Sequence, residues 1–374
     1  MTEAQGPVVC VGAVSRNTVD AVIELAYERD VRMYLIASRG QIDCEAGLGY
    51  VEGWSTATFA RYVHERDPHG LVALCRDHGG PWQSPSDAAG GLDEDAAMAS
   101  ALRSFRADVD SGFEIVHIDT SHEPGGAVPA PVAIGRMADL YGHVCAYAAP
   151  RRTLVEFEIG LEPQQSDVAD PDALRRTLAD VAAGLADRGL PRPRFVVAST
   201  GTKIVGRRNC GSIMDHRRAG LWQRYLAATV QACADFGAGV KAHNCDYLDP
   251  QAWQALVAAG IAGANIAPEC GVAETGALLG LLRREGLHRE RECFLRVAYE
   301  SGRWRKWVAG DGRVVDGELP ILAGHYVFCH PEVEAIREEL GRRLGGGRAE
   351  LDAHLRASIK GVIDRYLAHQ TRRG

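Results

Sequence analysis

The sequence of 374 residues lacks the patterns that mark membrane, secreted and disulfide-rich proteins. No stretch reaches the roughly 20 apolar residues that a transmembrane helix needs. The N-terminal segment MTEAQGPVVCVGAV has neither the basic start nor the long apolar core of a signal peptide. The ten cysteines are scattered, without a CxxC pair, which favours reduced thiols over disulfides in a chain of this length. We therefore expect a cytoplasmic protein with no membrane partner.

Two further absences concern partners and cofactors. A basic stripe interleaved with aromatic residues is missing and the formal net charge is −7, so nucleic acid is not an expected partner. No GxGxxG motif follows the first apolar run, which disfavours dinucleotide binding. Hydrophobic residues make up 46% and charged residues 24% of the chain, the balance of a globular protein with a sizeable core.

Short apolar runs rich in Val and Ile recur along the chain, each followed by a longer segment with helical spacing. Apolar runs without strict alternation are typical of parallel strands, which are buried on both faces. The runs are VVCVGAV (8–14), RMYLIAS (32–38), LVALCRD (71–77), EIVHIDT (114–120), LVEFEIG (154–160), FVVASTG (195–201), GVKAHNC (239–245) and GANIAPE (263–269). Eight strand–helix units predict an α/β fold, a (β/α)8 TIM barrel over residues 1–286. An open doubly wound sheet is the alternative.

Residues 287–374 follow a different pattern and predict a C-terminal helical extension packed on the barrel. The segments 331–341 and 349–369 have helical spacing, and the turn GRRLGGGR separates them. Several aromatic side chains precede these helices and could serve an oligomer contact. We therefore expect a homo-oligomer.

Polar residues concentrate at the ends of successive predicted strands, where barrel enzymes carry their catalytic groups. His78 and His243 follow the third and seventh strands, which face one another across a barrel mouth. Two imidazoles plus a thiolate or carboxylate, with one open position, hold catalytic zinc. We expect a divalent metal, Zn²⁺ first, although a lone histidine is often only a hydrogen-bonded core residue. The candidates for the third ligand are Cys210, His216, Lys203 and Glu158.

Asp77 directly precedes His78. Neighbours on an extended strand point to opposite faces, but the turning backbone at a strand end lets both reach one pocket. A carboxylate beside a metal can move a proton on a substrate hydroxyl while the metal polarises the adjacent carbonyl. Asp77 could equally orient a ligand or cap the following helix. The residues alone leave its role open.

Several motifs resemble the Z-type, so-called non-catalytic, subunit of class II tagatose-bisphosphate aldolase, and more distantly the catalytic class II fructose- and tagatose-bisphosphate aldolases. RDHGGPWQ (76–83) and KAHNCDYLD (241–249) are the specific blocks, similar to GDHLGPNxWQ and EAHSTDYQ of the Z-type subunits. GFEIVHIDTS (112–121), the segment 36–63 and SGRWRKWV (301–308) also follow the family pattern. The resemblance covers nearly the whole chain and is patchy between motifs.

The resemblance implies roles for individual residues. The catalytic aldolases carry an Asp-His pair on the third strand, IDGSH on the fourth, EAELG on the fifth, a histidine ligand on the seventh and a substrate-contacting asparagine on the eighth. By resemblance, these motifs assign catalytic Asp77, Asp119 and Glu158, metal ligands His78 and His243, and substrate-binding Asn265.

The chain departs from the family pattern at two places. The sixth-strand histidine ligand has no histidine counterpart in TGTKIVGRRNCGSI (200–213), and aligning NCGSI with DHSNI of the Z-type subunits puts Cys210 at that position. Thiolate binds zinc well, so Cys210 is our expected third ligand. After the eighth strand, Glu269 lies where the catalytic aldolases use small hydroxyl residues, and its charge would repel a phosphate dianion. The further residues expected to contact substrate are Gln41, His122, Lys203 and Glu269.

These expectations favour a metal-dependent enzyme that breaks and forms a C–C bond in a ketose or related polyhydroxy compound. If the fragments separate, the enzyme is an aldolase; if they rejoin after one turns over, it is a 4-epimerase. The alternative is a non-catalytic stabilising subunit with a catalytic aldolase as its partner. A carbohydrate-binding module fits poorly with so many titratable groups at one end of a barrel.

Overall fold

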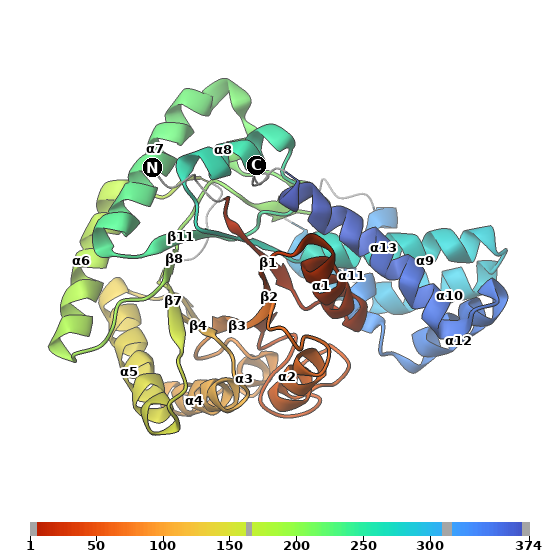
Figure 1. Cartoon of the computed structure of the whole chain (residues 1–374), viewed down its shortest axis with the longest axis horizontal. Helices are drawn as coiled ribbons and strands as arrows, with labels where there is room; N and C mark the ends of the chain where they lie inside the picture. Colours follow the sequence, from red (N-terminus) through yellow and green to blue (C-terminus); the bar gives the residue numbers. More distant parts are fainter. Residues whose placement is uncertain (1–5, 162–166, 309–315, 369–374) are drawn as a thin grey trace.

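The computed structural model describes residues 6–161, 167–308 and 316–368. Parallel strands close into a barrel in the order β1-β12-β11-β8-β7-β4-β3-β2 (Figure 1). The strands are β1 (Val8–Gly12), β2 (Met33–Ser38), β3 (Val72–Gly79), β4 (Ile115–Asp119), β7 (Glu156–Gly160), β8 (Phe195–Val197), β11 (Gly239–Ala242) and β12 (Gly263–Ile266). Each predicted run contributes one strand, and β1 pairs with both β2 and β12. The predicted TIM barrel is confirmed and the open sheet is excluded.

Helices follow the strands and surround the barrel (Figure 1). They are α1 (Arg16–Arg29), α2 (Thr56–His64), α3 (Pro85–Ala89), α4 (Glu94–Asp110), α5 (Ala130–Ala148), α6 (Pro171–Asp187), α7 (Ala219–Phe236), α8 (Pro250–Ala259) and α9 (Pro268–Arg284). Two short antiparallel hairpins lie in the loops after β4 and β8. They are β5 (His122–Glu123) with β6 (Gly126–Ala127), and β9 (Ile204–Val205) with β10 (Arg208–Asn209). No described helix is long and apolar enough to span a membrane.

Short polar side chains begin many of these helices. The Ser15 hydroxyl accepts a hydrogen bond from the backbone N–H of Thr18 at the start of α1. Asp93 and Asp249 cap α4 and α8 in the same way. An N-terminal cap is worth about 1 kcal/mol because it satisfies backbone donors that lack a partner in the first turn. These caps determine the residue at which each helix begins after its strand-end loop.

The alternation of side chains along each strand separates two apolar layers. On β4, Val116 and Ile118 point outward into the main core between barrel and helices. Ile115 points inward, into a smaller cluster with residues such as Cys75 and Phe195. Successive side chains on a strand face opposite ways, so the inward positions continue from Ile115 to residues 117 and 119. This register carries polar side chains into the barrel interior.

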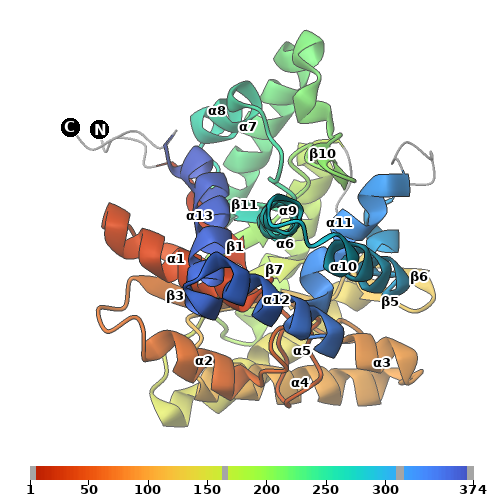
Figure 2. The same ribbon diagram turned by 90° about the vertical axis from the view of Figure 1, so that its right-hand side faces the viewer.

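The extension has its own core and returns to the barrel. It comprises α10 (His288–Glu300), α11 (Leu319–Ala323), α12 (Pro331–Leu344) and α13 (Gly347–Leu367), with 3₁₀ helices η4 (Arg303–Trp307) and η6 (Gly324–Val327). Leucines of α9 share the core of the extension, whereas Ile359 and Tyr366 of α13 join the main core. In Figures 1 and 2, α13 lies beside α1, against which it packs. The proposed boundary between residues 286 and 287 stays a prediction.

The predicted turn 341–348 is shorter than expected. Helix α12 continues through its basic residues to Leu344 and ends at Gly345. Gly345 has φ 88°, a left-handed conformation that costs glycine little and other residues more. The chain then enters α13 at Gly347. Helices α12 and α13 are thus joined by a minimal loop.

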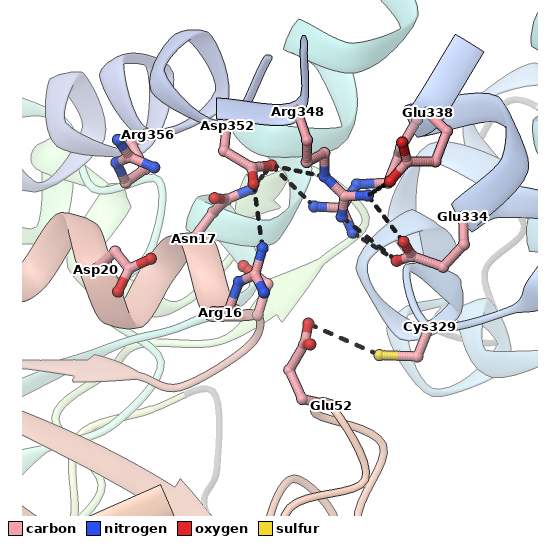
Figure 3. Close-up of polar contacts among 12 residues, drawn as sticks. Arg16, Asn17, Asp20, Glu52, Cys329, Glu334, Glu338, Arg348, Asp352 and Arg356 are labelled. Atoms are coloured by element: carbon pink, nitrogen blue, oxygen red, sulfur yellow. Dashed lines mark hydrogen bonds and ion pairs between the residues drawn. The ribbon is translucent and has the colours of Figure 1, made fainter. Parts of the chain in front are cut away.

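A network of charged residues joins α13 to the start of α1 (Figure 3). Asp352 accepts hydrogen bonds from Arg16 at 3.1 Å, Asn17 at 3.3 Å, Arg337 at 3.1 Å and Arg348 at 3.2 Å. Burial would raise the pKa of Asp352, but the guanidinium groups of Arg337 and Arg348 lower it. We call these five residues the junction network. Its positive and negative charges face one another, so it fixes the extension on the barrel.

A second carboxyl group lies next to the junction network. Glu274 of α9 is fully buried and accepts hydrogen bonds from the Ser15 hydroxyl at 2.5 Å and the Asn17 amide at 2.8 Å. Burial raises the pKa of Glu274 to about 7. Asn17 therefore links the carboxyl groups of α9 and α13 at the base of the first helix.

Candidate metal centre

Four residues from four strands bring ligand atoms together inside the barrel. Asp77 on β3, His117 on β4, Glu158 on β7 and His243 directly after β11 each offer one nitrogen or oxygen, and these atoms lie within 4.8 Å of one another. His117 and Glu158 are fully buried, and His243 is 3% exposed. We call these residues the barrel cluster. It is a group of side chains that could hold a metal ion inside the barrel.

The spacing of these atoms suits a tetrahedral cation. His243 Nε2 lies 3.1 Å from Glu158 Oε1 and 3.9 Å from Asp77 Oδ1. His117 Nδ1 lies 3.4 Å from Glu158 Oε1 and 3.7 Å from Asp77 Oδ1. Zinc–ligand bonds of about 2.0–2.1 Å imply ligand-to-ligand edges of about 3.3 Å in a tetrahedron. Small shifts of the side chains would bring all four atoms to that spacing.

The backbone around His78 fixes the His117 ring. His78 has φ 44°, and its N–H donates a hydrogen bond to His117 Nδ1 at 3.1 Å. The proton of a neutral His117 therefore lies on Nε2, a buried atom with no hydrogen-bond partner among the described residues. A Cβ atom on Gly160 would lie 2.6 Å from this Nε2, so glycine leaves room for the ring. In that tautomer the Nδ1 lone pair accepts the His78 hydrogen bond, so a cation bound by His117 would replace that bond and lie between Nδ1 and the two carboxylates.

One lysine balances part of the negative charge. Lys241 is fully buried, and its Nζ donates a hydrogen bond to Glu158 Oε2. Burial opposes ionisation of Glu158, yet Lys241 and the neighbouring histidines lower its pKa to about 2. Oxygen Oε1 of the same carboxylate is left facing His117 and His243. Burial lowers the pKa of His243, which keeps the imidazole neutral and able to bind a metal.

Asp119 and His78 form a second, more exposed pair beside the barrel cluster. His78 Nδ1 lies 2.6 Å from Asp119 Oδ2, while Ser121 donates to the other Asp119 oxygen through its N–H and its hydroxyl. Burial lowers the pKa of His78, but Asp77 and Asp119 together raise it to about 9. The ring centroids of His78 and His243 are 5.0 Å apart. Asp119 thus orients His78, whose Nε2 faces Asp77 at 3.9 Å.

Asn265 and Gln41 lie at the same end of the barrel. The Asn265 amide donates to Asp77 Oδ1 at 3.2 Å, and its own oxygen is buried without a hydrogen-bond partner among the described residues. Gln41 is buried and accepts a hydrogen bond from the backbone N–H of Ser38 at 2.7 Å. Asn265 therefore positions the carboxylate that the sequence marked for proton transfer.

Three of the predicted site residues are exposed, and of the expected metal ligands His78, Cys210 and His243 only His243 belongs to the barrel cluster. Cys210, Lys203 and His122 are exposed side chains in the loops after β8 and β4. The Cys210 N–H donates to the Lys203 carbonyl, which closes the β9–β10 hairpin loop. The structure therefore does not bring the Cys210 thiol into the barrel cluster, whose second imidazole comes from His117 on β4 and not from the expected His78. His216, the other candidate, lies 2.7 Å from Asp249 at the start of α8.

Glu269 is placed differently from the expectation of a charge facing the substrate. Its Oε2 accepts hydrogen bonds from the Tyr366 hydroxyl at 2.6 Å and from the backbone N–H of Tyr247 at 2.9 Å. Its Oε1 pairs with Arg365. The last turn of α13 therefore neutralises this carboxylate. Because its charge is neutralised, Glu269 is no longer expected to repel a phosphate.

The sequence reasoning missed His117 and Lys241. Both are inward-facing residues two positions before a residue that was singled out: His117 before Asp119 and Lys241 before His243. Side chains two positions apart on a strand point to the same face. This two-residue period could have shown that both side chains point into the barrel. The motif comparison drew attention to strand ends, where neither residue lies.

The comparisons with known proteins support the fold and do not assign a function. No family model matches the sequence, and no curated protein matches it. The crystal structure of a probable tagatose 6 phosphate kinase from Sinorhizobium meliloti 1021 has a TM-score of 0.79 and 22% identity, over 97% of this chain and 100% of that chain. A fructose-bisphosphate aldolase from Campylobacter jejuni has a TM-score of 0.55 and 13% identity, over 98% and 90%. At these identities the likeness shows a shared fold.

Proposed function

We propose that the protein is a metal-dependent enzyme that reversibly cleaves a C–C bond in a ketose or related polyhydroxy compound. The observation that carries this proposal is the convergence of Asp77, His117, Glu158 and His243 within 4.8 Å. The sequence motifs resemble those of class II aldolases, and a fructose-bisphosphate aldolase is among the structures similar in fold. A divalent metal, Zn²⁺ first, would be held by His117, Glu158 and His243, with Asp77 beside it. A fourth position would stay open for a substrate carbonyl, which the metal would polarise.

Asp77 is the group that we assign to proton transfer. Burial would raise its pKa, but His78 and His117 hold it well below its usual range, so the carboxylate is ionised at neutral pH. During cleavage it takes the proton from the carbinol hydroxyl as the C–C bond breaks, and the electron pair of that bond passes to the carbonyl fragment as an enediolate. During addition the proton returns. Asn265 holds this carboxylate by one oxygen.

Two other groups act on charge that develops in the reaction. His78, with a pKa of about 9, carries a proton at neutral pH and lies beside Asp77. We assign it to stabilising the oxyanion of the substrate, with Asp119 orienting its ring. Glu158 and Lys241 supply fixed charges below the reacting atoms. These groups would serve an aldolase and a 4-epimerase equally, so the proposal covers both.

Two other functions, a kinase and an assisting subunit, have weaker support. The Sinorhizobium structure is described as a probable kinase, but no glycine precedes a lysine in this chain, so it has no G-x-x-x-x-G-K-[ST] loop for phosphoryl transfer. The resemblance to Z-type subunits favours an assisting role beside a catalytic aldolase. A purely structural subunit gains no stability from four buried polar groups that lack a cation. A sugar substrate, a homo-oligomer and a cytoplasmic location stay predictions.

Elemental analysis of purified protein tests the proposal. Wild type is expected to carry about one zinc or other divalent transition metal per chain, and His243→Ala is expected to lose it. His354→Ala is the matched control, because His354 is an exposed histidine on α13. The metal-loaded protein is then screened with ketoses for aldehyde release and for epimer formation. Wild type that takes up no metal, even when metal is added, would contradict the enzyme and favour the assisting subunit.

A further inference from the structure

The loop after β11 carries His243 and has an unusual backbone. Asn244, the next residue, has φ 57°, and Tyr247 has φ 59°. Residues other than glycine avoid this left-handed region, and they stay in it only where the surrounding structure holds them. We call residues 243–247 the ligand loop. Contacts that hold the ligand loop therefore also hold the backbone of His243.

One side of the ligand loop is held by the segment after β8. The side-chain amide of Asn209 donates hydrogen bonds to the carbonyls of Asn244 at 2.8 Å and Asp246 at 3.0 Å. The Thr202 hydroxyl donates a hydrogen bond to the His243 carbonyl at 2.6 Å. These three hydrogen bonds use carbonyl groups, so the N–H groups of the ligand loop need other partners.

The other side of the ligand loop is held by the start of α9, through two carboxyl groups that accept hydrogen bonds in opposite directions. Asp246 Oδ1 accepts from the backbone N–H groups of Ala267 and Glu269, each at 2.9 Å. Glu269 Oε2 in turn accepts from the N–H of Tyr247 at 2.9 Å. Asp246 and Glu269 are both buried. Burial, followed by the charge of Glu269, raises the pKa of Asp246 to about 8, so Asp246 is largely protonated at neutral pH.

Glu269 is itself held by the last turn of α13. The Tyr366 hydroxyl donates a hydrogen bond to Glu269 Oε2 at 2.6 Å, and Arg365 pairs with Oε1. Tyr366 is 3% exposed, and its ring meets that of Trp253 on α8 edge-on, with 5.0 Å between centroids. Glu269 Oε2 thus receives one hydrogen bond from the C-terminal helix and one from the ligand loop. One carboxylate oxygen therefore links α13 to the loop that carries His243.

We propose that Glu269 is a positioning residue, which Arg365 and Tyr366 hold in place so that it fixes the ligand loop and thereby the metal ligand His243. The proposal rests on the proposed function, because it concerns a ligand of the same metal centre. Hydrogen bonds to an ionised carboxylate are stronger than those between neutral groups, so Glu269 can hold a loop whose backbone is strained. It acts through the backbone and adds no ligand to the barrel cluster. The C-terminal helix therefore serves metal binding as well as stability.

Hydrogen exchange of the metal-free protein tests the first step, the hold of Glu269 on the ligand loop. Glu269→Ala removes the acceptor of the Tyr247 N–H, so amide exchange in the peptide 243–248 is expected to become about tenfold faster. Glu269→Gln keeps an acceptor oxygen and is expected to exchange more slowly than Glu269→Ala. Tyr62→Phe is the matched control, because it removes a hydroxyl-to-carboxylate hydrogen bond of 2.7 Å to Asp20, between α2 and α1.

Zinc titration with a competing chelator tests the second step, the effect on His243. Glu269→Ala is expected to weaken zinc binding by about 10- to 100-fold, the range for partners that orient a metal ligand. Tyr366→Phe is expected to weaken it by up to about tenfold, the loss of one hydrogen bond to a charged group. Glu269→Gln should recover most of the affinity, and Tyr62→Phe should match wild type. Urea denaturation gives the folded fraction, because a purely structural residue would lower stability without changing the zinc affinity of the folded chain.

The two measurements separate this proposal from the proposed function. Unchanged exchange of the ligand loop in Glu269→Ala would overturn the positioning role, and so would faster exchange with the zinc affinity of wild type. If Glu269→Ala does not fold, the same two results in the milder variant Tyr366→Phe decide. Wild type that binds no metal would instead overturn the proposed function, while exchange of the metal-free protein would still show whether Glu269 fixes the ligand loop.

Discussion

The junction network and the barrel cluster are both buried sets of charged residues, but they differ in how their charges meet. Asp352 accepts hydrogen bonds from three guanidinium groups and an amide, each aimed at a carboxylate oxygen. In the barrel cluster, carboxylate oxygens of Asp77 and Glu158 instead face the nitrogens of two imidazoles, and Lys241 pairs with the other oxygen of Glu158. The first set pairs its carboxylate with cations of the chain itself, whereas the second would be completed by an added cation.

The difference shows that burial of charge does not by itself mark a functional site. A buried ion pair with matched donors and acceptors holds two parts of the chain together and leaves nothing for a ligand. A buried set of facing lone pairs lowers stability unless something binds between them. Unpartnered buried atoms occur in both sets among the described residues, Asn17 Oδ1 and Arg337 Nε in the junction network and His117 Nε2 in the barrel cluster. The arrangement of the charges is therefore what distinguishes the two sets. Four measurements test this difference.

The largest expected effect follows from removing His117. His117→Ala should weaken zinc binding by more than the roughly 100-fold that loss of an outer-shell partner causes, and turnover should fall to background. Cys210→Ser is the control, because its thiol lies outside the cluster, and it should keep both metal and activity. Zinc titration with a competing chelator measures the affinities. Metal loss in Cys210→Ser with retention in His117→Ala would restore the ligand set expected from the sequence.

Breaking the junction network should affect folding instead. Asp352→Ala leaves Arg16, Arg337 and Arg348 without their shared carboxylate and should lower the free energy of unfolding by about 3–5 kcal/mol. Asp364→Ala, which removes an exposed pair with Arg29, should cost at most about 1 kcal/mol. Urea denaturation measures both. Metal content per folded chain should stay at the wild-type value in each, and a metal-free Asp352→Ala would erase the contrast.

Glu274 makes stability depend on pH. Its pKa is about 7 in the folded protein and lies near 4.5 in the unfolded chain, so the folded state binds the proton more tightly. The associated stability is full below pH 4.5 and is lost as pH rises through 7, a change of about 3 kcal/mol. Glu274→Gln should remove this dependence. Unfolding free energies of both proteins from pH 5 to 8 give the comparison, and parallel curves would refute the assignment.

The smallest effect is expected at Asp119. Asp119→Asn keeps a hydrogen-bond acceptor for His78 but removes the charge that raises the pKa of His78 above its usual value. Activity should fall by about 10- to 100-fold, as for other outer-shell partners, with metal still bound. The pH–activity profile should lose its alkaline limit near 9 and fall off at lower pH. A profile identical to wild type would show that His78 does not act as a cation in the reaction.

The sequence predicted the barrel well because parallel strands buried on both faces give uninterrupted apolar runs. All eight runs became strands, and the helices follow from the segments between them. Strand-end motifs also led to Asp77, His243 and Asn265, which the structure places at one end of the barrel. His117 was missed because it lies inside a strand, where only the two-residue period reveals its direction.

Other residues could not be placed from sequence because their partners are distant in the chain. The residues next to Glu269 in the sequence offer no partner for its carboxylate. In the structure it pairs with Arg365 and Tyr366, about a hundred residues later. Cys210 was assigned through a short alignment, and the β9–β10 hairpin carries it outward.

The position of α13 has a consequence for the synthesis of this protein on the ribosome. Arg356 and Lys360 of α13 pair with Glu24 of α1, and Tyr366 satisfies Glu269 at the start of α9. Helix α1 leaves the exit tunnel long before α13, so these charges are matched late in synthesis. Domains begin to fold during translation from the N-terminus, but the surfaces of α1 and α9 that α13 covers stay open until α13 emerges. A nascent chain stalled before residue 347 would expose the surfaces of α1 and α9 and become a substrate for chaperones.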